Sequence, residues 1–146
     1  MSATGAGSAR RRRVYVDTSA YLCILLGEDD GRLSKETANA ELLSSVLLVL
    51  EARRTLIRLA RKGALTAEAY KACMDRVEMD IDLFVLRDLT LDLCHSSPLP
   101  AVATPRSLDL AHLRTALWFH AAERLDRFMT RDAAQEQAAK ELGLPV

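Results

Sequence analysis

Short apolar runs alternate with longer helical segments along this chain of 146 residues, and the alternation limits the folds open to it. Strands separated by helices can pair in parallel, because each helix carries the chain back across the sheet. The sequence therefore predicts an α/β sandwich with a mostly parallel central sheet. The predicted strands are Val14–Val16, Leu42–Ser45, Ile81–Leu86 and Arg127–Thr130.

The helical segments are marked by capping residues and stop signals. Gly63, which follows two basic residues, is typical of a helix end. Thr18 or Ser19 can cap one helix, and Ser107 can cap another. Helices are predicted over Ala20–Leu26, Leu33–Ala40, Val46–Lys62, Thr66–Met79, Asp88–Cys94, Leu108–Glu123 and Asp132–Leu142.

The length suits one domain. Residues 1–13 are rich in Gly, Ala and Ser and end in four arginines, so we expect a flexible basic tail followed by a single domain over residues 14–146. Cys23, Cys73 and Cys94 form no CxxC pair, which disfavours a disulfide framework or a zinc site. No apolar stretch is long enough to span a membrane, and no clean signal peptide is visible, so we expect a cytoplasmic protein.

Four acidic residues occupy positions that a parallel fold could bring together. Asp17 directly follows the first predicted strand and Asp132 follows the last, at the strand ends where open parallel sheets bind ligands. Glu51 interrupts an apolar helical run, and Asp109 lies in the first turn of a helix. Simpler explanations exist: Glu51 can pair with Arg54, and an acid favours a helix start. Gathered together, however, four carboxylates need a cation, and their hard oxygens suit Mg²⁺ or Mn²⁺.

The positive and negative charges of the chain balance, so the local arrangement of the charged residues is the informative feature. Twenty Lys and Arg residues match twenty Asp and Glu residues, so the overall charge does not favour nucleic acid. A local basic face beside the acids would still attract phosphates. The candidate contacts are Arg54, Arg58, Arg114 and Arg131, although a solvated helix face is the simpler explanation for the first two.

Four segments resemble the motifs of the PIN-domain family, in particular the VapC-type toxins of bacterial toxin–antitoxin pairs. They occur in the family's order and at family-like spacing, and the resemblance covers nearly the whole chain from residue 14 onward. It implies a three-layer α/β/α sandwich. It also implies a metal-dependent endoribonuclease that cleaves RNA phosphodiester bonds with water activated by Mg²⁺ or Mn²⁺. The segments are Val14–Ala20, Ser44–Glu51, Leu108–Ala116 and Phe128–Asp132, with Ala138–Leu144 resembling the family's C-terminus.

The resemblance makes these four acids the catalytic and metal-binding set, and we further expect each to have its own role. Asp17 and Asp109 would bind the principal ion, and Asp132 would complete its shell directly or through water. Glu51 would bind a second ion or orient the attacking water. His112, one helical turn beyond Asp109, is expected to pack or hydrogen-bond structurally rather than to act as a base. Supporting hydrogen bonds to the acids are expected from Thr18, Ser19 and Thr130.

The expected partners follow from the same resemblance. They are an RNA substrate, a VapB-like antitoxin that silences the toxin, and a second copy of the chain, with no membrane. Two other interpretations remain open. One is a PIN-fold interaction protein without catalysis, which the presence of all four acids disfavours. The other is a phosphatase of the haloacid-dehalogenase type, which needs a second aspartate where this chain has Ser19.

Overall fold

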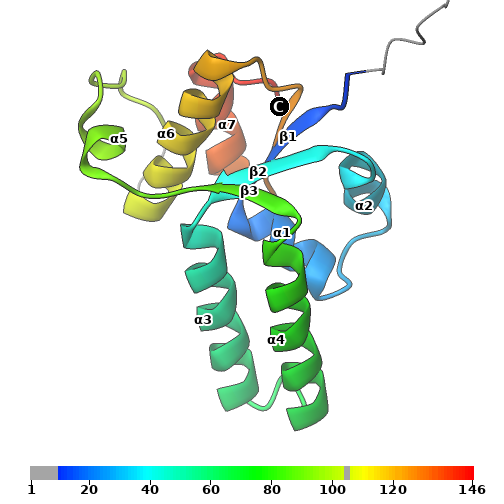
Figure 1. Ribbon diagram of the computed structural model, residues 1–146. Coiled ribbons are helices and arrows are strands. Elements are labelled where there is room, and N and C mark those ends of the chain that lie inside the picture. Colours follow the sequence, from blue (N-terminus) through cyan, green and yellow to red (C-terminus); the bar gives the residue numbers. More distant parts are fainter. Residues whose placement is uncertain (1–9, 104–105) are drawn as a thin grey trace, which may run out of the picture.

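A four-stranded sheet separates two layers of helices in this protein (Figure 1). The computed structural model describes residues 10–103 and 106–146. All three pairs of neighbouring strands run parallel, in the order β3-β2-β1-β4. The expected three-layer α/β/α sandwich with a parallel sheet is therefore confirmed. The strands are β1 (Arg13–Val16), β2 (Glu41–Ser45), β3 (Phe84–Arg87) and β4 (Arg127–Met129).

Every predicted helix is present, with its ends moved by a few residues. One strand also differs, because Ile81, where the strand was predicted to begin, belongs to a helix. Ile81 instead continues the inward face of its helix one turn beyond the buried Val77, and both pack in the same core cluster. The helices are α1 (Thr18–Leu25), α2 (Arg32–Thr37), α3 (Leu47–Arg61), α4 (Ala67–Ile81), α5 (Leu91–His95), α6 (Ser107–Ala122) and α7 (Ala133–Glu141).

Alternating side chains of β1 divide the core between the two faces of the sheet. Val14 and Val16 pack in a cluster with residues of α1, α3 and α4. Tyr15 packs on the other face with Leu113 of α6 and with residues of α7. Its ring stacks on that of Phe128 from β4, with centroids 5.4 Å apart. In Figure 1, α3 and α4 form a hairpin that projects away from the sheet.

The order of the strands places a crevice beside β1. From β1 the chain moves outward to β2 and β3, and then returns to the opposite side of β1 to form β4. Ligands of open parallel sheets bind at such a reversal, beyond the carboxyl ends of the strands. Asp17 directly follows β1 and Thr130 directly follows β4, so both lie at this reversal.

Two predicted helix caps are wrong. Asp17 caps α1, because its Oδ1 accepts a hydrogen bond from a backbone N–H of the first turn, 3.0 Å away. Thr18 and Ser19 lie inside that first turn, and their hydroxyls bond elsewhere. Similarly, Ser107 is the first residue of α6 rather than its cap, and Arg106 occupies the cap position.

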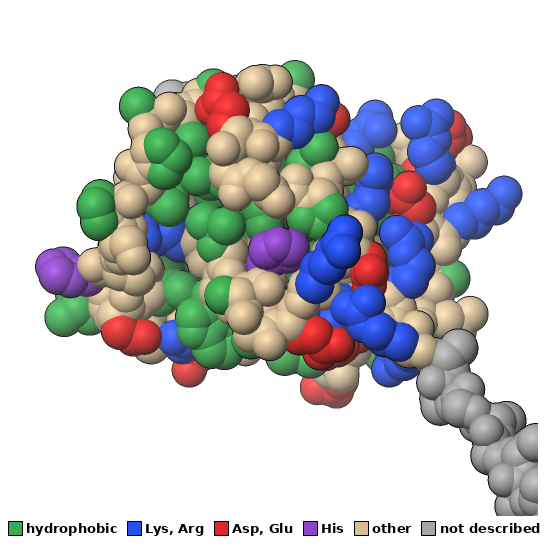
Figure 2. All heavy atoms as spheres, turned by 90° about the horizontal axis from the view of Figure 1, so that it is seen from above, with side chains coloured by type: hydrophobic (Ala, Val, Ile, Leu, Met, Phe, Trp, Pro, Cys, Tyr) green, Lys and Arg blue, Asp and Glu red, His purple; other side chains and the backbone are tan. Residues whose placement is uncertain are grey.

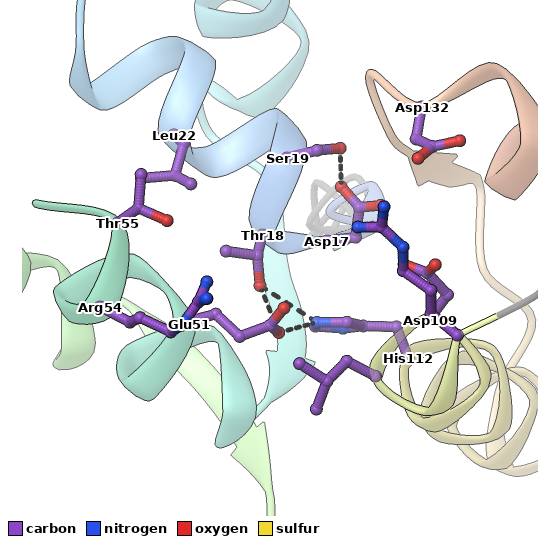
Figure 3. Close-up of a pocket in the computed structure, with 12 residues that line it drawn as sticks. Asp17, Thr18, Ser19, Leu22, Glu51, Arg54, Thr55, Asp109, His112 and Asp132 are labelled. Carbon is purple, nitrogen blue, oxygen red and sulfur yellow. Dashed lines mark hydrogen bonds and ion pairs between the residues drawn. The ribbon is translucent and has the colours of Figure 1, made fainter. Parts of the chain in front are cut away.

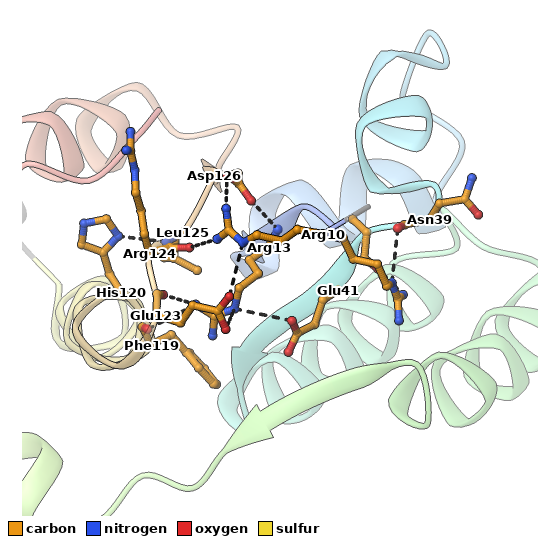
Figure 4. A network of polar contacts seen from close by, with 12 residues as sticks. Arg10, Arg13, Asn39, Glu41, Phe119, His120, Glu123, Arg124, Leu125 and Asp126 are labelled. Carbon is orange, nitrogen blue, oxygen red and sulfur yellow. Dashed lines mark hydrogen bonds and ion pairs between the residues drawn. The ribbon is translucent and has the colours of Figure 1, made fainter. Parts of the chain in front are cut away.

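The arginines that precede the predicted first residue of the domain contact the body of the protein (Figure 4). Arg13 belongs to β1, and only 7% of its side chain is exposed. Its Nε lies 3.5 Å from carboxylate oxygens of Glu41 and of Glu123, and its guanidinium donates to the backbone carbonyl of Glu123. Arg10 also pairs with Glu123, and Arg11 donates to the backbone carbonyl that precedes β2, 2.8 Å away.

The domain therefore includes at least one residue assigned to the tail by sequence. The rest of the predicted tail, residues 1–9, lies outside the described residues. Most basic side chains visible in Figure 2 gather at the end where the described chain begins, with acidic side chains among them. In the ranges given above, no helix combines the length and apolar character needed to cross a membrane.

Candidate active site

A cavity of about 550 Å³ lies at the ends of the strands, where α1, α3, α6 and α7 converge (Figure 3). Asp17 reaches it from the end of β1 and Glu51 from α3. Asp109 reaches it from the first turn of α6 and Asp132 from the cap of α7. The fold thus brings together all four acids that the sequence singled out.

Asp17 is the most buried of the four, with 4% of the residue exposed. Its Oδ1 accepts hydrogen bonds from the Ser19 hydroxyl, at 2.7 Å, and from the Ala20 N–H, at 3.0 Å. Burial raises the pKa of Asp17, and the hydroxyls of Thr130 and Ser19 offset part of that rise. The folded protein therefore compensates the negative charge of an ionised Asp17 only in part.

Ser19 joins the ends of β1 and β4. Its Oγ lies 3.1 Å from Thr130 Oγ1 and accepts a hydrogen bond from the Arg131 N–H at 2.9 Å. Since the Ser19 hydrogen is donated to Asp17, Thr130 donates in the contact between the two hydroxyls. Thr130 Oγ1 in turn accepts from the Asp132 N–H at 3.1 Å. The predicted supporting hydroxyls thus link two of the acids.

Glu51 contacts one residue that the sequence indicated, Thr18, and one that it did not, His112. Its Oε1 accepts a hydrogen bond from the Thr18 hydroxyl at 2.8 Å and lies 2.8 Å from His112 Nε2. Arg54, the partner that the simpler explanation offered, makes no ion pair with Glu51 in the described structure and acts through its charge alone. Burial would raise the pKa of Glu51, but His112, Thr18 and Arg54 together outweigh it and lower the pKa. Glu51 is therefore ionised at neutral pH.

Asp132 and Asp109 are tied together through α7. Oδ1 of Asp132 accepts from the N–H groups of Ala134 and Gln135, at 2.8 and 3.0 Å, and so caps that helix. The Gln135 side chain donates to the backbone carbonyl of Asp109 at 2.8 Å. Burial raises the pKa of Asp109, and the charges of Asp132 and Asp17 raise it further. The three aspartates are thus close enough to repel one another.

Three of these carboxylates use one oxygen for the protein and keep the other. Asp17 Oδ1, Glu51 Oε1 and Asp132 Oδ1 each accept two hydrogen bonds, whereas the second oxygen of each accepts none from the described residues. A carboxylate held in this way is oriented and still has an oxygen for a ligand.

The donor set fits a hard divalent cation, since carboxylate oxygens are the ligands that Mg²⁺ and Mn²⁺ prefer. Within residues 10–103 and 106–146, no three Asp, Glu, His or Cys side chains are already grouped as a metal site. Mg²⁺ commonly keeps several water ligands and is bound through one or two carboxylates, so it does not need a complete protein cage.

Two basic residues also line the cavity. Arg54 was anticipated, but Arg106 was not; the charge of Arg106 offsets part of the rise in the pKa of Asp109. The only sequence signal for Arg106 was its place three residues before Asp109, at the end of a proline-rich segment. Arg114 instead donates to the Ser96 hydroxyl at 2.8 Å, away from the acids. The candidates that do not line the cavity are Arg58, Arg114 and Arg131.

The raised pKa of Asp17 predicts how the stability of the metal-free protein depends on pH. The pKa of Asp17 is raised in the folded state, so above about 3.8 the folded protein retains a proton that the unfolded chain has lost. The contribution of Asp17 to the free energy of unfolding should therefore decrease as pH rises through this window. We therefore expect the stability of Asp17→Asn minus that of the unaltered protein to increase as pH rises above about 3.8.

Urea titrations in EDTA at several pH values would measure this difference. The comparison cancels groups with lowered pKa, such as Asp126, which stabilise the fold with the opposite pH dependence. A difference that stayed constant with pH would contradict the burial of a charged Asp17.

Comparisons of the sequence with known proteins add no assignment: no family model matches it, and no curated protein matches it either.

Proposed function

We propose that this protein is a PIN-like endoribonuclease that depends on Mg²⁺ or Mn²⁺ and hydrolyses RNA phosphodiester bonds in the acidic cavity. One observation carries the proposal: three carboxylates from separate elements each have one oxygen fixed by protein donors and the other left for a ligand. A fourth acid, Asp109, has its pKa raised by two of them. A divalent cation would relieve this repulsion.

The four acids would divide the binding. Asp17 and Asp109 would hold the principal ion, with Asp132 completing its shell directly or through water. Glu51 would hold a second ion or orient the attacking water. A bound divalent ion would lower the pKa of water and stabilise negative charge on the phosphate. The protein itself supplies oriented carboxylates, and hydrogen bonds keep Glu51 ionised.

Positive charge beside the acids would hold the substrate. Arg54 enters the cavity from α3, and Arg106 enters it from the residue before α6. Guanidinium groups bind phosphate oxygens well because their fork of donors matches the phosphate. The two arginines would thus contact the phosphates around the cleaved bond.

Direct cleavage assays would test the proposal. Single-stranded RNA labelled at its 5′ end, incubated with the protein and Mn²⁺, should yield fragments ending in a 3′-hydroxyl and new 5′-phosphates. EDTA should stop the reaction. Intact RNA together with no measurable Mn²⁺ binding would instead favour the non-catalytic interaction protein. Hydrolysis of a small phosphomonoester would favour the phosphatase. That class needs a second aspartate where this chain has Ser19, and Ser19 donates a hydrogen bond to Asp17.

Changing Arg106 should separate substrate binding from ion binding. We expect Arg106→Gln to raise the KM for RNA roughly 3- to 10-fold, equivalent to about 1 kcal/mol of lost phosphate contact. The slope of the logarithm of RNA affinity against the logarithm of salt concentration should become shallower by about 0.7, as expected when one phosphate contact with a single strand is lost. Mn²⁺ affinity should be unchanged or higher, because a positive charge near Asp109 is removed.

The matched control is Arg61→Gln, at the far end of α3 and outside the cavity. It should change neither the KM for RNA and its salt dependence nor the affinity for Mn²⁺. Loss of Mn²⁺ affinity in Arg106→Gln would argue against a role in substrate contact.

We also propose, from the motif resemblance, that the enzyme is the toxin of a toxin–antitoxin pair, acting in the cytoplasm and silenced by a VapB-like antitoxin. Exposed apolar side chains on α3, at Leu50 and Ile57, are available to a partner chain or to a second copy. Induced expression should arrest growth, and Asp17→Asn should not. Growth that returned when the protein encoded next to this gene was co-expressed would identify the antitoxin, whereas growth unaffected by the active protein would count against the toxin role.

A further inference from the structure

On the basis of the proposed function, we infer that His112 is a positioning residue for Glu51, and that Tyr15 in turn holds His112. Sequence alone suggested only a structural role for this histidine. The structure instead shows a hydrogen-bonded chain that runs from the buried strand β1, through the imidazole, to a carboxylate that lines the cavity.

Both nitrogens of His112 are engaged, and only 3% of the residue is exposed. Nε2 lies 2.8 Å from Glu51 Oε1 and 3.1 Å from Thr18 Oγ1. Nδ1 lies 2.7 Å from the hydroxyl of Tyr15, which is fully buried. Figure 3 shows the imidazole edge directed at Glu51 and Thr18. The ring is therefore fixed from both sides.

The hydrogen atoms can be assigned from the partners. An ionised Glu51 can only accept, so Nε2 must carry the hydrogen of its contact with Glu51 Oε1. The single hydroxyl hydrogen of Thr18 is donated to the same oxygen. This assignment holds whether Nδ1 accepts from Tyr15 or donates to it. His112 is thus a fixed donor toward Glu51 in either case.

The two donors determine which oxygen of Glu51 can bind an ion. Thr18 and His112 both bond Oε1, so Oε2 is the atom left for a ligand. Without His112, Thr18 alone would restrain a flexible side chain. Hydrogen-bond partners that orient metal ligands typically change metal affinity 10- to 100-fold when they are removed.

The spacing in the sequence explains why these groups meet. Tyr15 lies two residues before Asp17 along one extended segment, and His112 lies three residues after Asp109 on α6. Side chains at i and i+2 of a strand, or at i and i+3 of a helix, share a side. The two elements that provide Asp17 and Asp109 therefore also provide Tyr15 and His112, the two links of the chain that leads to Glu51.

Two substitutions of His112 test the donor specifically. His112→Gln can place an amide N–H near the position of Nε2, whereas His112→Phe keeps a ring but has no donor. We expect Mn²⁺ affinity, measured by electron paramagnetic resonance, to fall 10- to 100-fold in His112→Phe and to stay within about threefold in His112→Gln. RNA cleavage by His112→Phe should recover substantially at saturating Mn²⁺.

Tyr15→Phe tests the next link in the chain. It keeps the ring that stacks on Phe128 but removes the hydroxyl from Nδ1. We expect a smaller loss of Mn²⁺ affinity, and no further loss when it is combined with His112→Phe. His95→Phe, at the exposed end of α5, is the matched control and should bind Mn²⁺ as the unaltered protein does.

Melting temperatures in EDTA would identify variants that fail to fold, in which case Tyr15→Phe and His112→Gln carry the test. Wild-type Mn²⁺ affinity together with wild-type RNA cleavage in a folded His112→Phe, or equal losses in the Gln and Phe variants, would overturn the role of His112 and leave the proposed function standing. No Mn²⁺ binding by the unaltered protein would overturn the proposed function, and the role of His112 with it.

Discussion

Asp17→Asn is expected to reduce Mg²⁺-dependent RNA cleavage by a factor of about a thousand or more, which corresponds to about 4 kcal/mol of lost transition-state stabilisation. Asp17 is the deepest acid of the cavity, and Oδ2 is its oxygen left for a cation. A neutral amide keeps the shape of the side chain but not the charge that holds a divalent ion. Initial cleavage rates at several Mg²⁺ concentrations would measure the loss.

The same variant should be at least as stable as the unaltered protein when no metal is present. Burial raises the pKa of Asp17, which means that the folded state disfavours its charge. Asparagine removes that charge and is also a good residue at a helix N-cap. Mg²⁺ should then raise the melting temperature of the unaltered protein, because binding stabilises only the folded state, and should raise that of the variant much less.

Asp75→Asn is a suitable control, since this exposed carboxylate on α4 pairs with Lys71 outside the cavity. It should leave cleavage unchanged. Undiminished cleavage by Asp17→Asn would refute the assignment. Lost cleavage accompanied by a much lower melting temperature would point to a defect in folding instead.

Phe128→Ala is expected to lower the free energy of unfolding by about 3–5 kcal/mol, the range seen when a buried aromatic ring is removed. Phe128 is 1% exposed and stacks on Tyr15 with ring planes 5° apart. Domains are stable by only about 5–15 kcal/mol, so the change would remove a large share of the total. Urea unfolding monitored by circular dichroism would measure it.

Two further substitutions provide reference values for this loss of stability. Phe128→Leu retains most of the apolar volume and should cost clearly less than Phe128→Ala. Leu91→Ala removes a side chain that is 82% exposed and should change stability by less than about 0.5 kcal/mol. Similar losses for Phe128→Ala and Leu91→Ala would be inconsistent with a core centred on this ring.

Much of the framework could be predicted from the sequence, because it depends on local patterns. The strands after which Asp17 and Asp132 lie are short runs with clear strand character, and a parallel sheet places their ends together. The start of β3 was misjudged because Ile81 suits a strand as well as the inward face of α4. Apolar character alone does not distinguish the two.

The contacts of the cavity could not be predicted, since they join distant segments. The sequence suggested Arg54 as a partner of Glu51 because neighbours on a helix can be recognised from their spacing. His112, in contrast, is brought to Glu51 only by the packing of α6 beside β1 and β2. Likewise, Trp118 of α6 is 44% exposed, and the Arg87 guanidinium lies 4.5 Å from its ring centroid. Such pairings depend on tertiary structure.

The projecting α3–α4 hairpin separates parts of the protein that can evolve at different rates (Figure 1). Glu51 lies near the root of the hairpin, whereas Arg61 lies ten residues further along α3, roughly 15 Å away at the rise of an α-helix. Mutations at the tip can alter charge or length without moving a carboxylate. Selection could therefore change the sequence of the tip while the acids at the root stay fixed.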